Sequence, residues 1–588
     1  VTSLDEALQK LTPSFSSMTN GMGTTLSLNG LPDDYFIFLE NGKRLYGDDT
    51  YARINVAKIK RIEILNGASS ALYGTNAIGG VINIITDDAK NAINVSSDTR
   101  YASKGRFTQS VNIDVNTGKF GSYTSYRRQQ AEGWQLNPYE ENSKTHELEE
   151  TGKVASTGFY ANTVNQKFTF DATDKLSFYA RGGYYDNKTR RPYEAYDYNI
   201  LHETFNYGIG AQYMINKGNY ITADCYADHF SSSYCFFKDN KTYNGKAGEE
   251  QVRKRTRNHN LSIKGIFKLG NRHKLSVGTE YIVDVLKSQT DNIAKEDAYT
   301  LALFAQDEIK LLRNLQALIG VRYIYHENFK NHATPNVALM YKPGKFNFRA
   351  SYAAGFRTPT LSELYATDIA KKNDRLTIGN LDLKPEKNNY FSLSAEYVHE
   401  RFSVSVNAFY NNIRDMIDYN TIATGDKAME QYGHKEVRQR DNIAEAKVHG
   451  INVSANAYLG AGFNLSGGYT HLNTQDVELE QPIDKSIKNA YNINAQWAHS
   501  WKIYRLNINL NGRINSKRFS KSYGYAPEYQ LWDLNTRHSF NLKSVIIEPG
   551  FGMENLFDYM DDRPYNSNYA TLTPGRSFYI SLSLKFKS

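Results

Sequence analysis

The 588-residue sequence has few cysteines, few prolines and no long apolar run. Its two cysteines exclude a disulfide scaffold, and 13 prolines with 41 glycines exclude a collagen-like or proline-rich disordered chain. No apolar stretch approaches the roughly 18 residues that a helix needs to cross a bilayer. This excludes a bundle of transmembrane helices. The 70 basic and 62 acidic residues are spread along the chain without a basic block, so we expect no nucleic-acid partner.

Motifs of enzyme active sites are missing as well. HExxH, GxSxG and CxxC do not occur, and Gly74, Gly79 and Gly80 lack the strand–turn–helix context of a nucleotide-binding loop. Paired carboxylates such as Asp48 and Asp49 are adjacent, so they point apart in an extended chain. We therefore expect that the protein is not an enzyme.

The sequence is rich in aromatic residues and in regular alternation. It contains 44 tyrosines and 29 phenylalanines, and from about residue 93 apolar and polar side chains alternate with a period of two. Near the end of the chain, Phe578, Ile580, Leu582, Leu584 and Phe586 alternate with Ser577, Tyr579, Ser581, Ser583 and Lys585. An alternation sustained over so many residues is typical of a β-barrel with lipid outside and a wet lumen.

Short polar connections allow the strands to be counted. Ten of them occur near Gly118, Asp174, Gly218, Asn271, Asn314, Gly344, Arg401, Ala461, Lys502 and Leu542. Longer polar stretches lie between them, at residues 128–158, 186–206, 232–256, 357–388 and 412–447. Ten turns at one rim, with both chain ends at that rim, predict eleven hairpins and therefore an all-β barrel of 22 antiparallel transmembrane strands.

The first 92 residues follow a different pattern, which predicts a small α+β unit. Leu4, Ala7, Leu8 and Leu11 recur at helical spacing, and residues 35–39, 59–64 and 81–85 are predicted strands. A barrel of 22 strands is wide enough to need a plug. We therefore expect a plug domain at 1–92 inside a barrel at 93–588.

Several segments resemble TonB-dependent outer-membrane receptors. In the plug they are FIFLENGKRL at 36–45, IKRIEI at 59–64 and GASSALYGTNAIGGVINIIT at 67–86. In the barrel, GFRTPTL at 355–361 and GNLDLKPE at 379–386 resemble paired loop boxes of the family, and NLFD at 555–558 with PGR at 574–576 resembles its terminal hairpin. The resemblance covers essentially the whole chain.

The resemblance implies an integral protein of the bacterial outer membrane that imports a large, scarce nutrient. Import would be driven by periplasmic TonB, although the TonB box that precedes the plug core in the family is missing from this sequence. The plug sequence favours an active receptor over a passive porin. The long stretches 357–388 and 412–447 also fit a surface lipoprotein that caps the barrel.

Within the family, four segments are similar to the cobalamin receptor branch. They are residues 185–189, 193–196, 415–419 and 442–455. The resemblance therefore implies cobalamin or a related corrinoid as the ligand, with haem or a ferric siderophore as alternatives.

The two alternative ligands make different demands on the sequence. The plug has no histidine, and His326, His332 and His434 are isolated, so imidazole ligation of haem has little support, although tyrosine can also ligate haem iron. A siderophore site needs aromatic and basic side chains that face an anionic chelate. Candidates for the basic side chains are Arg44, Arg53, Arg127 and Arg128.

Two loops of the plug are the predicted ligand contacts. Glycine lets the backbone approach a ligand closely, Asp, Thr and Asn supply polar groups, and tyrosine adds an apolar face with a hydroxyl tip. Simple turns are the alternative interpretation. The predicted ligand-binding residues are Asn20, Gly21, Met22, Gly23, Thr24, Tyr46, Gly47, Asp48, Asp49, Thr50 and Tyr51.

We expect no resident cofactor, with one alternative. That alternative is calcium bound by acidic loops, because oxygen ligands suit this ion. The acidic residues are Glu132, Glu140, Glu141, Glu147, Glu149, Glu150, Asp186 and Asp197. Their spacing matches no calcium template, so solvated charged loops are favoured. Cys225 and Cys235 are ten residues apart, too far for a disulfide along one strand.

Overall fold

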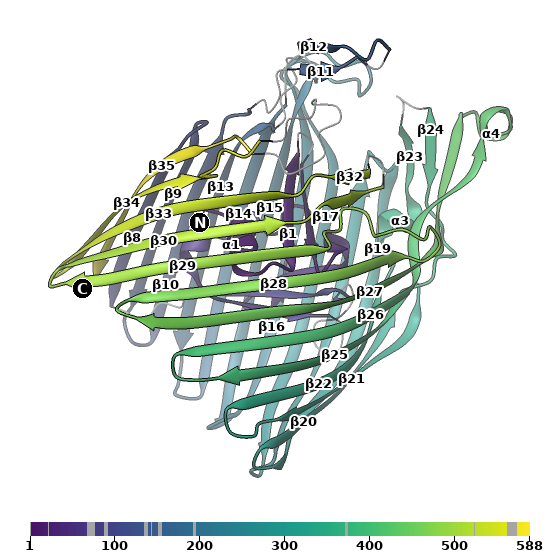
Figure 1. The fold of residues 1–588 in the computed structure, drawn as a ribbon. Helices are drawn as coiled ribbons and strands as arrows, with labels where there is room; N and C mark the ends of the chain where they lie inside the picture. The colour runs from purple at the N-terminus through teal and green to yellow at the C-terminus, as the bar shows by residue number, and fades with distance from the viewer. Residues whose placement is uncertain are drawn as a thin grey trace.

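A closed β-barrel surrounds a small N-terminal domain in the computed structural model (Figure 1). The structure describes residues 2–20, 23–67, 74, 77–86, 92–134, 139–142, 144–150, 156–191, 196–370, 374–521, 524–560 and 573–587. Within these residues no helix is long and apolar enough to span a membrane. The barrel wall is made by strands.

The wall contains 22 antiparallel strands, as predicted. They are β8 (Ile93–Ala102), β9 (Arg106–Asn116), β10 (Phe120–Ala131), β13 (Gly158–Asp171), β14 (Leu176–Arg190), β15 (Tyr198–Asn216), β16 (Asn219–Phe236), β17 (Glu250–Leu269), β18 (His273–Ser288), β19 (Ile293–Leu312), β20 (Leu315–His326), β21 (Lys330–Tyr341), β22 (Phe346–Arg357), β25 (Glu386–Val398), β26 (Phe402–Thr424), β27 (Glu436–Gly460), β28 (Phe463–Asp476), β29 (Asn489–Trp501), β30 (Tyr504–Asn515), β33 (Tyr529–Leu542), β34 (Val545–Glu554) and β35 (Ser577–Lys587). Pairing of β35 with β8 closes the barrel, so none of these 22 wall strands is left as an unpaired edge.

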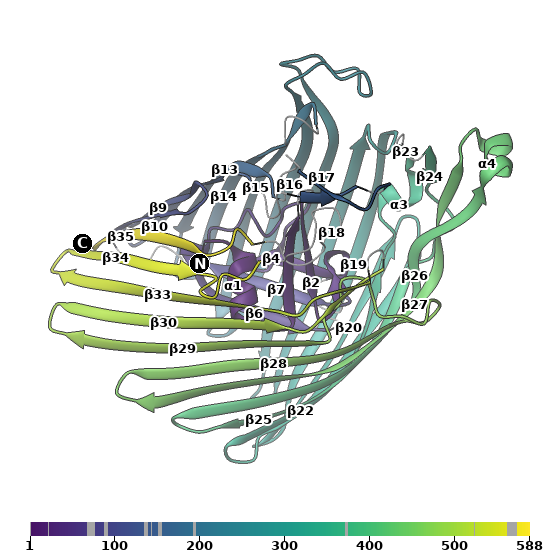
Figure 2. The same ribbon diagram turned by 45° about the horizontal axis from the view of Figure 1, so that its top comes forward.

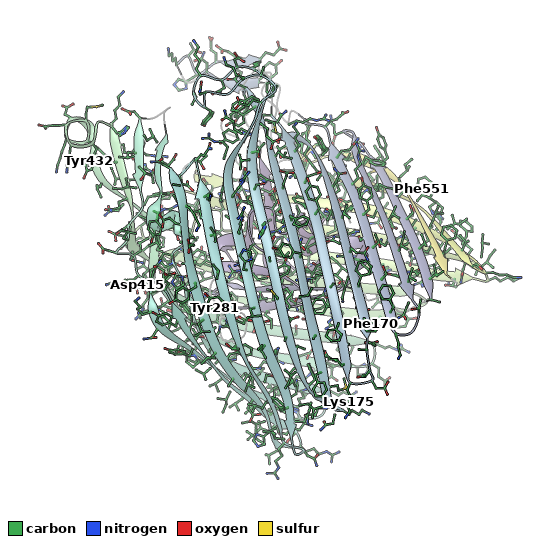
Figure 3. The ribbon with its side chains drawn as sticks, turned by 180° about the vertical axis from the view of Figure 1, so that it is seen from behind. Phe170, Lys175, Tyr281, Asp415, Tyr432 and Phe551 are labelled. Carbon is green, nitrogen blue, oxygen red and sulfur yellow. The ribbon has the colours of Figure 1, made fainter. Side chains whose placement is uncertain are left out.

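The alternation along β35 matches the two faces of the wall. Phe578, Ile580 and Leu582 are 56%, 58% and 42% exposed and point outward. Tyr579 and Ser581 lie on the opposite, lumen face, where Arg100 packs over the Tyr579 ring with 3.6 Å from its guanidinium carbon to the ring centroid. Figure 3 shows the outer surface with Phe170, Tyr281 and Phe551 on it. The prediction of lipid-facing and lumen-facing sides is confirmed.

The ten short turns are also confirmed, but two of the five long polar stretches, 186–206 and 412–447, consist mostly of strand. β14 and β15 leave only residues 191–197 between them, and β26 and β27 leave only 425–435. These strands continue beyond the apolar band because their backbone ladder stays paired. Above the bilayer the outer face no longer needs apolar side chains, so the alternation that marks a strand disappears from the sequence.

Short elements decorate the rim with long connections. They are the hairpin of β11 (Tyr139–Glu141) and β12 (Leu148–Glu150), α3 (Leu361–Tyr365), the hairpin of β23 (Thr367–Ala370) and β24 (Arg375–Ile378), α4 (Gly425–Tyr432), and the hairpin of β31 (Arg518–Ser520) and β32 (Gly524–Ala526). β24 pairs with β27 in parallel, and α4 projects at the tip of the β26–β27 arm (Figure 1).

The N-terminal domain lies inside the ring of strands (Figure 2). It consists of α1 (Leu4–Leu11), β1 (Phe15–Asn20), β2 (Gly23–Leu28), β3 (Leu31–Pro32), η1 (Asp33–Tyr35), β4 (Phe36–Glu40), β5 (Lys43–Arg44), η2 (Val56–Lys58), β6 (Ile59–Asn66) and β7 (Gly80–Thr86). A four-stranded sheet has the order β5-β4-β7-β6, and β1-β2-β3 form a second sheet. Leu4 and Leu8 of α1 pack with Phe36 and Ile82 in the core.

Candidate ligand site between the plug and the barrel

The predicted plug loop at 46–51 is held against the barrel wall by a buried ion pair just beyond its end. Arg53 donates from Nη1 to both oxygens of Asp228 on β16, at 3.0 and 3.1 Å, and the Asp228 side chain is fully buried. The same carboxylate accepts a hydrogen bond of 2.9 Å from the backbone N–H of Tyr46, and Arg53 also donates to the Tyr46 carbonyl. One wall carboxylate therefore fixes both ends of the loop.

The two aspartates of the loop also reach the wall. Asp49 accepts from His202 Nδ1 at 2.7 Å and from Asn187 at 3.3 Å, while Asp48 lies 3.5 Å from the ammonium of Lys254. Burial would raise the pKa of the Asp49 carboxyl, but the hydrogen bond and charge of His202 outweigh it and lower that pKa. Asp49 is therefore used as an anchor, whereas Asp48 is exposed.

The other predicted loop is described only in part. Asn20 ends β1 and Gly23 begins β2, whereas Gly21 and Met22 lie outside the described residues. Thr24 is hydrogen-bonded to Tyr51, which places the turn end of this hairpin beside the 46–51 loop. Thr50 is half-buried. Burial raises the pKa of Tyr51 and of Tyr46, so both phenols stay protonated and able to donate. Ligand contact by these loops stays a prediction.

A cavity of about 1150 Å³ lies between the plug and the wall. Tyr46, Gly47 and Asp48 line it, together with Arg44 and Lys254. Gly47 has a φ of +84° and packs so closely on Phe230 of β16 that a Cβ would lie 2.6 Å from the ring. Close approach of the backbone therefore explains why a glycine occupies position 47. The backbone approaches the barrel wall there, whereas the sequence predicted close approach to a ligand.

Only one of the four candidate arginines is placed to meet a ligand in this cavity. Arg44 lines it, with its guanidinium 4.9 Å from the Tyr46 ring centroid. Arg53 is committed to Asp228, and Arg127 is buried and donates to the carbonyls of Ala52 and Ile54. Arg128 is exposed on the opposite face of β10 from Arg127, so it points away from the lumen. Three of the four assignments are therefore wrong, because two of these guanidiniums serve the fold and one faces outward.

Sequence reasoning missed an aromatic and cationic cluster at the extracellular end of β15–β17. Tyr198 and Tyr234 stack with ring centroids 4.0 Å apart, and Tyr243 packs edge-on against Tyr234 at 5.1 Å. Arg253 lies over Tyr243 at 4.9 Å and over Tyr234 at 5.3 Å. A neighbouring cavity of about 730 Å³ is lined by Tyr243, Arg253 and Lys254, and Lys254 lines the larger cavity too. The register of β15 and β16 brings these residues together, and no local motif marks it.

The paired loop boxes meet in one buried network. Arg357 donates to both oxygens of Glu363, at 3.0 Å each, and to Glu386 at 2.5 Å. Tyr35 of the plug donates to the same Glu386 oxygen at 3.2 Å. Burial and the charge of Glu386 raise the pKa of Tyr35, which keeps its hydroxyl proton in place. The boxes therefore tie an extracellular loop to the plug.

Metal binding has little support among the described side chains. No group of three or more His, Cys, Asp or Glu residues in the described ranges is arranged to hold a metal ion. His332 stacks on Phe356 and lies 3.0 Å from the Phe329 carbonyl, and His434 lies 2.9 Å from Asp374. Calcium in the acidic loops stays a prediction. Both cysteines are free, as expected.

A closed barrel with a folded domain in its lumen defines a plugged outer-membrane transporter. Residues 104–556 match the family model described as TonB dependent receptor-like, beta-barrel, and residues 1–81 match the TonB-dependent receptor plug domain. The chain belongs to the TonB-dependent receptors, so it is an integral outer-membrane transporter and not an enzyme.

Solved structures share the fold at low sequence identity. A point mutant of the ferric enterobactin receptor PfeA from Pseudomonas aeruginosa has a TM-score of 0.83 and 17% identity, over 100% of this chain and 96% of that one. The siderophore receptor PirA from Acinetobacter baumannii gives 0.81 and 17%, over 100% and 98%. The FrpB iron transporter from Neisseria meningitidis gives 0.77 and 14%, over 100% and 97%.

Proposed function

We propose that this receptor imports a ferric siderophore, an anionic iron chelate. The observation that carries the proposal is the adjacency of the aromatic cluster of Tyr198, Tyr234 and Tyr243 to the cations Arg253 and Lys254. Aromatic faces pack against planar chelating groups, and guanidinium or ammonium groups offset their negative charge. Likeness to two siderophore receptors and an iron transporter supports the same ligand class.

The corrinoid assignment has weaker support. It rests on short sequence similarities, and none of the solved structures named above is a cobalamin receptor by its description. Haem is weaker still, because His332 and His434 are engaged with protein groups. Direct contact of the ligand with Tyr46, Gly47 and Asp48 at the floor of the cavity remains part of the proposal.

Equilibrium binding to one purified preparation tests the proposal. Ferric enterobactin as a catecholate chelate, cyanocobalamin and haemin would be titrated separately. We expect tight binding of the chelate alone. The variants R44Q and R253Q should each weaken it by roughly ten-fold, because a charged hydrogen bond contributes about 1.5–3 kcal/mol. R128Q is the matched control, because this exposed arginine points outward. Tight binding of cyanocobalamin without chelate binding would instead establish the corrinoid.

Two protein partners are proposed: TonB, because of the family, and a capping lipoprotein, because of the arm that projects from the extracellular rim. TonB supplies the energy for import in this family, so uptake should stop when the inner-membrane complex is uncoupled. Liposome conductance should stay near the background, since the plug fills the lumen, whereas a passive porin would conduct.

The projecting arm of β26, α4 and β27, with Met429 43% exposed, is the surface we propose for a capping lipoprotein. Co-purification of such a lipoprotein, lost when α4 is deleted, would test it.

A further inference from the structure

The ten short turns of the wall carry a strong excess of positive charge. Short turns of such barrels lie on the periplasmic side. The residues between the paired strands at these turns include ten basic residues but only two acidic ones, Asp174 and Glu400. The whole chain has 70 basic and 62 acidic residues, so its composition does not account for this excess. The ten basic residues, which we call the basic ring, are Lys119, Lys175, Lys217, Arg272, Arg313, Lys342, Lys345, Arg401, Lys502 and Lys543.

The basic ring follows the whole periplasmic rim. All ten turns lie within the described residues, and among them only the turn of Ala461 and Gly462 between β27 and β28 has no basic residue. Because the barrel is closed, these turns follow one another around its circumference. Figure 3 shows Lys175 at a turn at the end of the wall, below Phe170 on its outer surface. A partner bound at one side would need charge on that side alone, so the ring indicates an anion that surrounds the barrel.

The charge of the basic ring is not neutralised within the protein. All ten side chains are exposed, and none of them forms an ion pair with a carboxylate of the described residues. The ion pairs next to Arg272 use other cations: His273 lies 2.6 Å from Asp307, and Lys274 lies 2.8 Å from Glu308. The positive charge of the ring is therefore available to an external anion.

The basic ring lies directly at the edge of the apolar band. Trp501 and Ile503 flank Lys502 and are 45% and 57% exposed. Most members of the ring have such an exposed apolar or aromatic neighbour in sequence, namely Phe120, Leu312, Tyr341, Phe346, Phe402, Trp501, Ile503 and Leu542. Consecutive residues of a strand are about 3.3 Å apart, so the charges begin within one residue of the apolar surface. That is the level of the lipid headgroups, which border the hydrocarbon core.

We propose that the basic ring binds the phosphate headgroups of anionic phospholipids in the periplasmic leaflet of the outer membrane. The apolar stem of a lysine or arginine lies along the lipid-facing surface while its charged end reaches the headgroup. Lysine offers phosphate a point charge, and arginine adds paired hydrogen bonds. The ring thereby fixes the depth of the barrel in the membrane and surrounds its periplasmic opening with anionic lipid. This role does not depend on which nutrient the receptor imports.

Quenching of tryptophan fluorescence by brominated lipids tests this proposal on the full chain. Trp497 and Trp501 lie on β29 at this rim, beside Lys502, and the pairing of β30 with β33 makes the turn of Lys543 its neighbour. The chain would be reconstituted into phosphatidylcholine vesicles with brominated phosphatidylglycerol or, in parallel, brominated phosphatidylcholine. The parent should prefer phosphatidylglycerol about five-fold, because a basic residue near an anionic lipid surface contributes roughly one kcal/mol. Equal quenching by the two lipids would overturn the proposal.

Three variants assign that preference to the charges of the ring. K502Q/K543Q removes the two charges nearest to these tryptophans and should lower the preference to about one. K502R/K543R keeps both charges and should keep the preference. K427Q/K435Q removes two exposed lysines from the opposite, extracellular rim and should behave like the parent. A preference that persists in K502Q/K543Q, or that is lost equally in K427Q/K435Q, would overturn the proposal.

Further arms separate a lipid from a free anion, from the cell wall and from a folding defect. Inorganic phosphate and sodium chloride at equal ionic strength should lower the preference equally by screening; a larger loss in phosphate would show a free-phosphate site and overturn the lipid assignment. Sedimentation of the parent with purified peptidoglycan, without any lipid preference, would assign the ring to the cell wall instead. If K502Q/K543Q does not refold into a heat-modifiable barrel, the parent still decides the matter, because a preference that does not fall as salt rises would contradict the ring.

Discussion

Asp228 of the barrel wall and Arg53 of the plug form a fully buried ion pair, with Nη1 at 3.0 and 3.1 Å from the two carboxylate oxygens. The residues are 175 positions apart in the chain. The pair also holds the backbone of Tyr46, so it positions the loop that lines the candidate ligand cavity. This ion pair is therefore a charged latch between the plug and the wall, and it lies directly beside the candidate ligand cavity.

The variant D228N should loosen this loop. The asparagine keeps the shape but removes the charge, which leaves the Arg53 guanidinium buried without a counter-ion. Breaking a buried pair in this way costs about 3–5 kcal/mol. Amide exchange in residues 46–53 should rise strongly while the wall stays protected. The control D239N removes an exposed partner of Lys246, with 64% and 76% exposure, and should change nothing measurable. Equal exchange in parent and D228N would contradict the latch.

Acid should release the second anchor of the loop. The pKa of Asp49 is lowered in the folded protein, so its contacts stabilise the loop at every pH above the unfolded value of about 3.9. That stability is lost only as the pH falls through the lowered pKa. A protonated His202 also supports this pair, so the Asp49 step is measured below about pH 6, where the imidazole is charged. Exchange of residues 46–53, corrected for intrinsic rates, should be constant from about pH 6 to pH 5 and rise in stronger acid. D49N should lack that acid step, and a step of the same size in D49N would argue against Asp49.

The sequence predicts the barrel well because lipid imposes a physical rule on every strand. Alternation across β35 is visible because one face meets hydrocarbon and the other meets water. Beyond the membrane surface the outer face meets water as well, so the alternation disappears. The sequence of the extracellular parts of β26 and β27 therefore predicts a loop, although both are strands. The plug was recognised by resemblance, since its mixed sheet has no single period.

The candidate site was harder to predict because its contacts join distant strands. Arg53 and Arg127 looked like free cations in sequence, yet both are buried by partners far away in the chain. Tyr198, Tyr234 and Tyr243 meet through the register of β15 and β16 and the connection that follows. Register across a large barrel follows from the sum of many pairings, and no local pattern encodes it.

A lysine on the lipid face should be far more costly than one on the lumen face. Leu582 is 42% exposed on the outer surface of β35, so L582K should destabilise the barrel by about 2–4 kcal/mol near mid-bilayer. Ser581 faces the lumen opposite Arg100, so S581K should cost under about 1 kcal/mol, mainly from the two like charges. Urea titration of folding into lipid vesicles compares the two variants. Equal losses would show that the faces are assigned wrongly.

Gly67 of the plug should tolerate no side chain because of a single ring on the wall. A Cβ there would lie 2.2 Å from the nearest atom of the Tyr390 ring, and the backbone φ is +77°. Gly42 has the same φ but no neighbour within 4 Å, so G42A carries only the left-handed strain of about 1–2 kcal/mol. G67A should cost that strain plus a further 1–3 kcal/mol or so for overpacking. Thermal unfolding and protease nicking of the plug measure both. Tyr390 is buried on β25, so Y390A is destabilising by itself, but G67A should add only the strain in that background. If G67A costs the same with and without the Tyr390 ring, the plug is not seated against β25 at this point.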